Sequence, residues 1–207
     1  MASRNPQGAI EKRRQILDAA IRTFARQGFH ACRVSDIADE AGVAYGLVYH
    51  YFRSKDEILD TLFLERWDVL LAAIREVDES DLAAREKLRS IATFIVESYR
   101  HDPDLMKVII VEVTRAANSF GRRHLGKIAE AYALIAEIVA KAQADGEFKS
   151  DVTPQFAAMA FYGAIEQVLT GWIFDLLPSG SQDFPQATNF IIETICGGLE
   201  QPAVHSR

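Results

Sequence analysis

Residues 34–55 read VSDIADEAGVAYGLVYHYFRSK, and this stretch decides the fold of the first part of the chain. Its apolar positions and its glycine predict a short helix over residues 35–41, a break at Gly42 and a second short helix over residues 45–51. Glycine suits the left-handed position that ends a helix. Two short helices joined in this way are typical of a helix-turn-helix, whose first helix braces the second in the DNA major groove. A helical hairpin inside a larger bundle is the alternative.

The charges of the chain favour DNA binding by its first part. The chain of 207 residues has a net charge of −6. Residues 1–55 carry nine Lys and Arg against five Asp and Glu, a net charge of +4, whereas residues 56–207 carry a net charge of −10. A basic N-terminal head, residues 1–55, on an acidic body, residues 56–207, is expected when only the head binds the phosphates of DNA. A chance cluster of Lys12, Arg13 and Arg14 on a solvated helix would produce the same imbalance.

The rest of the sequence predicts helices. Apolar residues at helical spacing, bounded by glycine or proline, indicate helices over residues 9–27, 55–74, 82–101, 104–117, 119–145, 154–177 and 184–199. Ser54 and Glu57 form a capping box at the start of one helix, and Thr153 caps another that has proline at its first position. We therefore expect an all-α protein, with an N-terminal three-helix domain over residues 1–55 and a helical bundle over residues 56–207.

The sequence argues against a disulfide scaffold, a metal site and a membrane protein. Cys32 and Cys196 lie far apart and form no CxxC pair, which suggests a reducing cytosol. His30 and Cys32 are too few ligands for a metal ion. Charged residues interrupt the N-terminus where a signal peptide needs an apolar run. The longest apolar stretch, around residues 157–165, is far short of the roughly 20 residues that span a membrane. We expect a cytoplasmic protein.

Catalytic motifs are missing as well. The sequence has no Glu-x-x-His pair for a di-metal site in a helical bundle, no glycine-rich phosphate loop and no nucleophile elbow. An enzyme is therefore not expected. An adaptor that uses the hairpin only as structure is a further alternative, which salt-dependent DNA binding would exclude.

The segment GVAYGLVYHYFRSK, residues 42–55, resembles the signature of the TetR family of bacterial transcriptional regulators. The flanking Gln-Gly-Phe at residues 27–29 and Asp-Ile-Ala at residues 36–38 fit the same family, and the match covers roughly residues 9–63. The resemblance implies that residues 1–55 bind DNA and that residues 56–207 bind a ligand and form a dimer. One position departs from the pattern: Ala44 stands where Ser or Thr often caps the recognition helix, which removes about 1 kcal/mol of local support.

The resemblance also carries a set of DNA-contacting positions to this chain. They are Arg33, Ser35, Tyr45, Gly46, Leu47, Tyr49, His50, Tyr51 and Lys55. We expect Ser35, Tyr45 and Gly46 at base edges, since a hydroxyl can bond a donor or an acceptor and a ring can contact a thymine methyl group. Tyr49, His50 and Lys55 are expected at phosphates, which set the register without reading the sequence.

The last two long helices are expected to form the dimer interface. Small and apolar residues gather on one face of each helix: Phe156, Met159, Ala160, Gly163, Ala164, Gln167, Val168 and Gly171 on the first, and Phe190, Ile191, Thr194, Ile195 and Gly198 on the second. Tight packing within one chain would explain the same residues. The resemblance favours a homodimer through a four-helix bundle, which would present two recognition helices to a palindromic operator.

Two segments resemble the acyl-CoA-responsive, FadR-type branch of the family. They are GAIEQVLTGWIF at residues 163–174 and the stretch from Glu112 to Tyr132. In the second segment, Arg115 and Arg122 match arginines that hold the phosphates of coenzyme A, and Arg123 adds charge beside them. Arginine suits this role because its planar fork donates two parallel hydrogen bonds to phosphate. A solvated helix face is the plainer reading of these charges.

An acyl chain needs an apolar lining. The candidates are Leu62, Trp67, Leu70, Phe94, Ile110, Phe161 and Trp172, although aromatic residues at helical spacing are also typical of a core. The leading hypothesis is a dimeric repressor of fatty-acid metabolism genes that long-chain acyl-CoA releases from its operator. The alternative is a repressor that answers another hydrophobic or cationic compound, such as an efflux substrate. Arg115 and Arg122 favour an anionic ligand.

Overall fold

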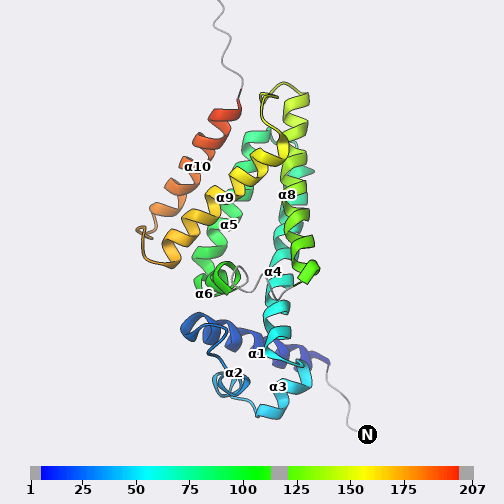
Figure 1. The fold of residues 1–207 in the computed structure, drawn as a ribbon, viewed down its shortest axis with the longest axis vertical. Coiled ribbons are helices and arrows are strands. Elements are labelled where there is room, and N and C mark those ends of the chain that lie inside the picture. Colours follow the sequence, from blue (N-terminus) through cyan, green and yellow to red (C-terminus); the bar gives the residue numbers. More distant parts are fainter. Residues whose placement is uncertain (1–5, 113–120, 201–207) are drawn as a thin grey trace, which may run out of the picture. The chain divides into compact units, whose positions relative to one another are not determined.

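The computed structural model describes residues 6–112 and 121–200, and helices dominate this part of the chain. The expected all-α class is confirmed. The helices are α1 (Pro6–Gln27), α2 (Val34–Ala41), α3 (Tyr45–Tyr51), α4 (Lys55–Asp78), α5 (Ala84–His101), α6 (Pro103–Lys107), the π-helical turn η1 (Val108–Glu112), α8 (Gly121–Ala144), α9 (Pro154–Ile173) and α10 (Asp183–Leu199) (Figure 1). An isolated bridge pairs Phe148 with Glu200.

The chain divides into two compact units. The first contains residues 1–66 and 102–121, and the second contains residues 67–101 and 122–207. The first unit therefore continues past residue 55, through the first half of α4, and adds α6 and η1. Because α4 crosses from the first unit into the second, the border between the units falls inside a helix and not in a linker.

The first unit is built around a continuous apolar core. Helix α1 contributes a fully buried stripe that includes Ile16, Ala20 and Phe24, and Gly28 ends the helix with a φ of +80°. Val48 and Phe52 pack into the same core from α3 and the residue after it. Helix α4 and η1 complete the core with their own buried apolar residues. Packing against this stripe stabilises the short helices α2 and α3, because isolated helices of this length are only marginally stable.

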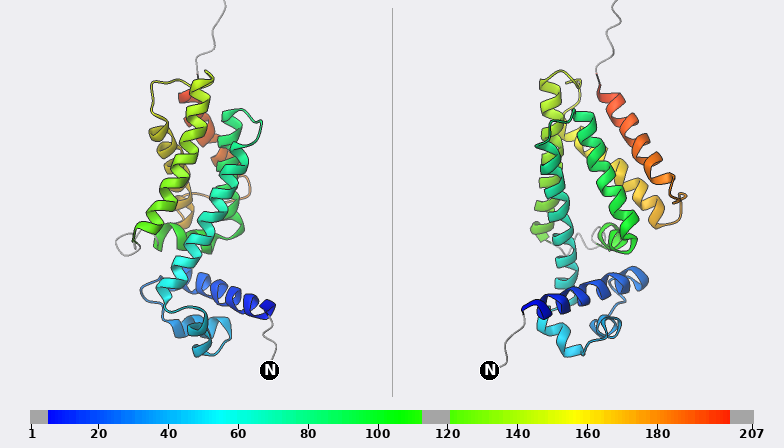
Figure 2. Two further views of the ribbon diagram at one scale, coloured as in Figure 1. Left: turned by 90° about the vertical axis from the view of Figure 1, so that its right-hand side faces the viewer. Right: turned by 180° about the vertical axis from the view of Figure 1, so that it is seen from behind.

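The second unit packs α5, α9 and α10 together and sets α8 beside the second half of α4 (Figure 2). Three ion pairs join α4 to α8: Arg75 with Glu130, Asp68 with Lys127 at 2.6 Å, and Asp78 with Lys141 at 2.7 Å. Arg85 joins α5 to Glu193 of α10 and to Glu200, the residue that follows α10, each at 2.5 Å. No helix in the described ranges has the length and hydropathy to cross a bilayer.

Several helix boundaries differ from the sequence expectations, by the largest margin at α6 and at the ends of α4 and α9. The helix expected over residues 104–117 consists of the short α6 followed by the π-helical turn η1, and its last residues lie outside the described ranges. Helix α9 ends at Ile173 and not at Leu177, because the backbone turns to a φ of +54° at Asp175. The N–H of Leu176 then donates to the Gly171 carbonyl at 2.7 Å.

The cap of α4 also differs in part from the expectation. The Ser54 hydroxyl accepts from the N–H of Glu57 at 3.1 Å, as expected for a capping box. The Glu57 carboxylate, however, accepts from the N–H of Arg53 at 2.6 Å, one residue before the position that the motif predicts. Both bonds satisfy amide groups at the start of α4, so the cap performs its role with a shifted partner.

Candidate nucleic-acid interface and ligand site

The turn between α2 and α3 has the geometry that the sequence predicts. Gly42 has φ +63° and ψ +37°, and its N–H bonds to the carbonyls at the end of α2. The N–H of Val43 donates to the Ala38 carbonyl at 3.0 Å, which closes the turn. Helix α2 buries Ile37, Ala38 and Ala41, whereas α3 buries only Val48. Helix α3 therefore lies with most of its surface available to a partner.

Two tyrosines form a unit on the exposed side of α3. Tyr45 is 53% exposed and Tyr49 is 45% exposed. Their hydroxyls lie 3.1 Å apart, and their ring centroids are 5.1 Å apart at an interplanar angle of 70°. The hydrogen bond shared with Tyr45 and partial desolvation raise the pKa of Tyr49. Exposed rings held in this way are suited to contact with a groove, since they lose little freedom on binding.

The start of α3 offers two further features. Gly46 needs neither its backbone angle nor its small size for the fold, because a Cβ built there meets no atom within 4 Å. Ala44 has the extended backbone of an N-cap residue, and its side chain makes no capping bond. The open space at Gly46 favours close approach of a partner to the α3 backbone. The Ala44 side chain confirms that this helix begins without a side-chain cap.

The remaining predicted DNA contacts differ in their exposure. Arg33 and His50 are exposed, and Ser35 and Leu47 are half-buried. Tyr51 is half-buried against the core of the first unit and touches the His50 ring. Arg33 is the N-cap residue of α2, and its N–H donates to the Asp36 carboxylate at 2.8 Å. This bond is the main reason that the pKa of Asp36 is lowered.

Lys55 points inward. Its ammonium donates to the carbonyls of Phe29, His30 and Cys32 at 2.7, 3.2 and 2.9 Å. These bonds use all three N–H groups of a lysine. The predicted phosphate contact stays a prediction, and in the structure this charge is engaged by the protein's own backbone. Sequence reasoning placed Lys55 by its position in the motif, which carries no information on the direction of its side chain.

Other basic residues of the head also have partners within the first unit. Glu40 binds Arg22 at 2.7 Å and Arg26 at 3.2 Å, which lowers the pKa of the Glu40 carboxyl. Arg13 binds Glu65 at 2.9 Å. These pairs brace α1 against α2 and α4, so the positive charge of the head is not all directed to a partner.

The predicted arginines of the ligand site cannot be placed. Arg115 lies outside the described residues, and for Arg122 and Arg123 the structure describes only their place in the first turn of α8. Among the side chains that the structure describes, no group of three His, Cys, Asp or Glu residues could hold a metal ion.

The predicted apolar lining is distributed over both units. Leu62 belongs to the core of the first unit, and Ile110 is half-buried in η1. Leu70 and Phe94 line a cavity of about 250 Å³ between α4 and α5. Phe161, on α9, is buried. The structure thus brings Leu70 and Phe94 together and places Leu62 in the core of the first unit.

The two tryptophans of the predicted lining sit in separate aromatic clusters. Trp172 stacks on Tyr99 at 5.4 Å and meets Phe184 edge-on at 4.9 Å, and its N–H donates to the Pro178 carbonyl at 2.8 Å. These contacts assign Trp172 to the packing of α5, α9 and α10. Trp67 instead lies 5.9 Å from the ring of Tyr162.

Sequence reasoning missed a half-buried carboxylate in the cluster around Trp67. Tyr162 also meets Tyr132 edge-on at 5.4 Å, and Glu166 follows Tyr162 by one turn of α9. Burial raises the pKa of Glu166, and the pKa of Tyr132 is raised by burial and by the charge of Glu166. The sequence did contain a signal for this carboxylate: Glu166 is the single acidic residue in the otherwise apolar helix α9. A helix that faces the interior must bury part of such a side chain.

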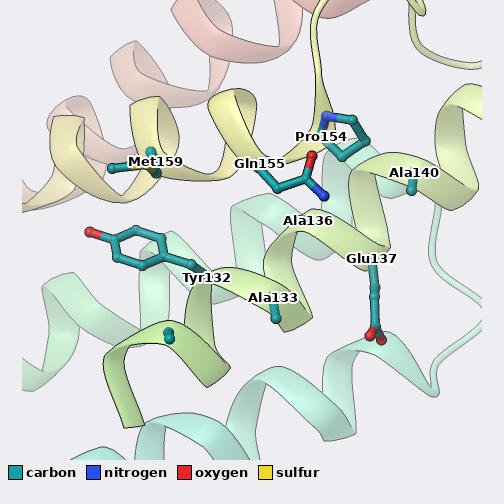
Figure 3. A pocket seen from close by; sticks show the side chains of 9 residues that line it. Tyr132, Ala133, Ala136, Glu137, Ala140, Pro154, Gln155 and Met159 are labelled. Atoms are coloured by element: carbon teal, nitrogen blue, oxygen red, sulfur yellow. The ribbon is translucent and has the colours of Figure 1, made fainter. Parts of the chain in front are cut away.

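A groove of about 430 Å³ between α8 and α9 was also missed (Figure 3). Its residues are Ala129, Tyr132, Ala133, Ala136, Glu137, Ala140, Pro154, Gln155 and Met159. The four alanines recur at helical spacing along α8, so the stripe was readable in the sequence. Tyr132 links this groove to the aromatic cluster that contains Trp67.

The faces expected at a dimer interface are partly exposed. Phe156 and Phe190 are each 69% exposed and Met159 is 59% exposed, and a Cβ added at Gly163 or Gly198 would meet no atom within 4 Å. Two residues that were predicted to lie on these interface faces are instead covered within the chain. Ile191 is buried within its own chain, and Gly171 is covered by the side chain of Leu177.

Comparison with known proteins gives consistent matches along the chain. Residues 16–62 match the family described as bacterial regulatory proteins of the tetR family, and residues 63–178 match the C-terminal region of YsiA-like proteins. The fatty acid metabolism regulator protein of Bacillus subtilis is 29% identical over 186 residues, which are 89% of this chain and 94% of that protein.

Two solved structures have the same fold. The fatty acid degradation regulator FadR of Bacillus halodurans aligns with a TM-score of 0.81 at 24% identity, over 95% of this chain and 97% of that one. FadR of Bacillus subtilis in complex with stearoyl-CoA aligns with a TM-score of 0.75 at 26% identity, over 89% of this chain and 97% of that one.

Proposed function

Because the chain belongs to the TetR family of bacterial transcriptional regulators, we propose that it is a dimeric repressor of fatty-acid metabolism genes. In this proposal the dimer binds a palindromic operator through the helix-turn-helix, and a long-chain acyl-CoA releases it. One observation supports the choice of effector: the similarity to the fatty acid metabolism regulator of Bacillus subtilis extends through the C-terminal region and covers 89% of this chain.

The proposed DNA surface consists of the exposed side of α3 and the start of α2. Tyr45, Gly46 and Ser35 read base edges, and Tyr49 and His50 contact phosphates. Arg33, Leu47 and Tyr51 flank these contacts. The exposure of the Tyr45–Tyr49 pair and the open space around Gly46 support this assignment.

The proposed effector site places Arg115 and Arg122 at the phosphates of coenzyme A, with Arg123 beside them. The acyl chain needs apolar surface, and the cavity lined by Leu70 and Phe94 supplies some of it within the second unit. The solved relative that contains stearoyl-CoA supports a coenzyme A thioester as the effector class.

A second effector class has an observation of its own. Three aromatic rings and a half-buried carboxylate, from Trp67, Tyr162, Tyr132 and Glu166, gather in the second unit. Aromatic faces with a nearby carboxylate suit an organic cation. A repressor released by a hydrophobic cation is therefore the competing proposal.

The deciding experiment measures release of a labelled operator, selected from random duplexes, by fluorescence anisotropy. Stearoyl-CoA should release the parent at a lower concentration than stearate or coenzyme A alone, since each lacks one half of the ligand. Arg115→Ala/Arg122→Ala should raise the half-release concentration at least roughly tenfold, because each charge-assisted hydrogen bond contributes about 1.5–3 kcal/mol.

Arg100→Ala is the matched control. This exposed arginine pairs with Glu97 on its own helix at 3.0 Å, and its removal should leave release unchanged. Equal half-release by stearoyl-CoA in the parent and the double variant would reject the arginine assignment. Release by hexadecyltrimethylammonium and not by stearoyl-CoA would favour the cationic effector.

A further inference from the structure

The ammonium of Lys55 joins the first residue of α4 to the loop between α1 and α2. Besides its bonds to the carbonyls of Phe29, His30 and Cys32, it lies 4.5 Å from the centroid of the Phe29 ring. Three convergent carbonyls and an aromatic face satisfy an ammonium group completely. To bind a phosphate, the ammonium would have to give up at least one of these bonds.

The loop that Lys55 holds leads directly into α2. It begins at Gly28, whose positive φ ends α1, and it ends at Arg33, the N-cap residue of α2. Three carbonyls of this loop lie outside the helices, and the ammonium of Lys55 donates to them. The backbone of Arg33 follows immediately after the Cys32 carbonyl, and Ser35 lies in the first turn of α2.

We propose that Lys55 is a positioning residue for operator binding: it fixes the segment that carries Arg33 and Ser35, and it makes no phosphate contact. The inference rests on the DNA-binding half of the proposed function and does not involve the effector. If the parent binds no operator, the proposed function fails. If the parent binds and the Lys55 variants behave otherwise than below, this inference alone fails.

Salt dependence separates positioning from phosphate contact. The logarithm of the binding constant falls with the logarithm of salt concentration, and loss of one phosphate contact reduces that slope by about 0.9. Lys55→Gln should weaken operator binding roughly tenfold. Its slope should match that of Arg53→Gln, a control that removes the same charge from an exposed side chain two residues earlier. A slope about 0.9 shallower than this control would overturn the proposal.

Lys55→Arg keeps the charge and changes the geometry. A planar guanidinium can still bond a phosphate but cannot direct its N–H groups to three carbonyls around one point. The proposal predicts that Lys55→Arg loses affinity nearly as much as Lys55→Gln does. Parent-like binding by Lys55→Arg together with weak binding by Lys55→Gln would assign Lys55 to phosphate.

A double-mutant cycle distinguishes positioning from a general loss of stability. If Lys55 acts through Arg33 and Ser35, then Lys55→Gln should cost much less affinity in an Arg33→Ala/Ser35→Ala background than in the parent. A role in stability alone would add the same factor in both backgrounds and would contradict the proposal. Thermal melting of each variant establishes that the measurements are made on folded protein.

Discussion

Tyr45 and Tyr49 differ in what their hydroxyl groups can offer to DNA, although they are bonded to each other at 3.1 Å. In the proposed assignment Tyr49 meets phosphate, so Tyr49→Phe should weaken binding by roughly 1 kcal/mol, the typical contribution of one hydrogen bond. The loss should be similar on operator and scrambled duplexes. Tyr45→Ala should instead lower the ratio of operator to scrambled affinity, since it removes a base contact.

Anisotropy titrations of both variants on both duplexes test this division of roles. Because the two hydroxyls share a bond, the effects of the two substitutions should not add when they are combined. An unchanged ratio for Tyr45→Ala would show that this residue does not read bases.

Glu166 should reduce the stability of the folded chain at neutral pH. Burial raises the pKa of its carboxyl, so the folded state favours the protonated form relative to the unfolded state. The resulting penalty is absent below the ordinary pKa of 4.5 and grows as pH rises through the raised value. Glu166→Gln should therefore raise the melting temperature by roughly 2 °C at pH 7, a small gain because the group is partly solvated.

The gain should disappear at about pH 4, where the parent carboxyl is protonated in both states. Glu79→Gln is the matched control, since Glu79 is an exposed glutamate in the same unit and should show no gain at either pH. Equal melting temperatures for parent and Glu166→Gln at pH 7 would show that the carboxylate is well solvated.

At the scale of single elements, α3 is a helix of seven residues that begins without a side-chain cap. Ala44 already has the extended backbone of an N-cap residue, with φ −63° and ψ 138°. Ala44→Ser should therefore add a hydrogen bond to the first turn and raise the free energy of unfolding by about 1 kcal/mol. Urea unfolding measures this, with Ala44→Val as a control that supplies no acceptor. A loss of stability on Ala44→Ser would contradict the assigned cap geometry.

Elements with local boundary signals were predicted well from the sequence. Helix α3 has the predicted bounds, and α9 begins at Pro154, where the Thr153 hydroxyl accepts from the N–H of Phe156 at 3.3 Å. Boundaries that depend on distant contacts were missed. Helix α9 ends early at the turn through Asp175, where Leu177 folds back over Gly171, and nothing local marks that turn. The same reason explains Lys55, whose partners lie 23 to 26 residues away along the chain.

At the scale of the whole molecule, α9 and α10 leave large apolar side chains uncovered. Phe156, Met159 and Phe190 are all more than half exposed in the single chain. Scattered exposed apolar residues are ordinary, whereas a contiguous apolar patch marks an interaction surface, and we infer that these residues form such a patch. A second copy of the chain is the proposed partner, since a two-fold dimer supplies the second recognition helix that a palindrome requires.

Phe190→Glu should convert the proposed dimer to a monomer, because it would bury an unpaired carboxylate at the interface. Operator affinity should fall roughly a hundredfold or more, since two linked heads bind with an avidity that one head lacks. Leu82→Glu is the control: Leu82 is 48% exposed and lies between α4 and α5, outside the two helices of the proposed interface, so both mass and affinity should be retained. Sedimentation of both variants gives the mass, and anisotropy on a full and a half operator gives the affinity. If Phe190→Glu stays dimeric and keeps the parent affinity, the interface lies elsewhere. If the variant is monomeric but binds the full operator as tightly as the parent, DNA binding does not depend on dimerisation.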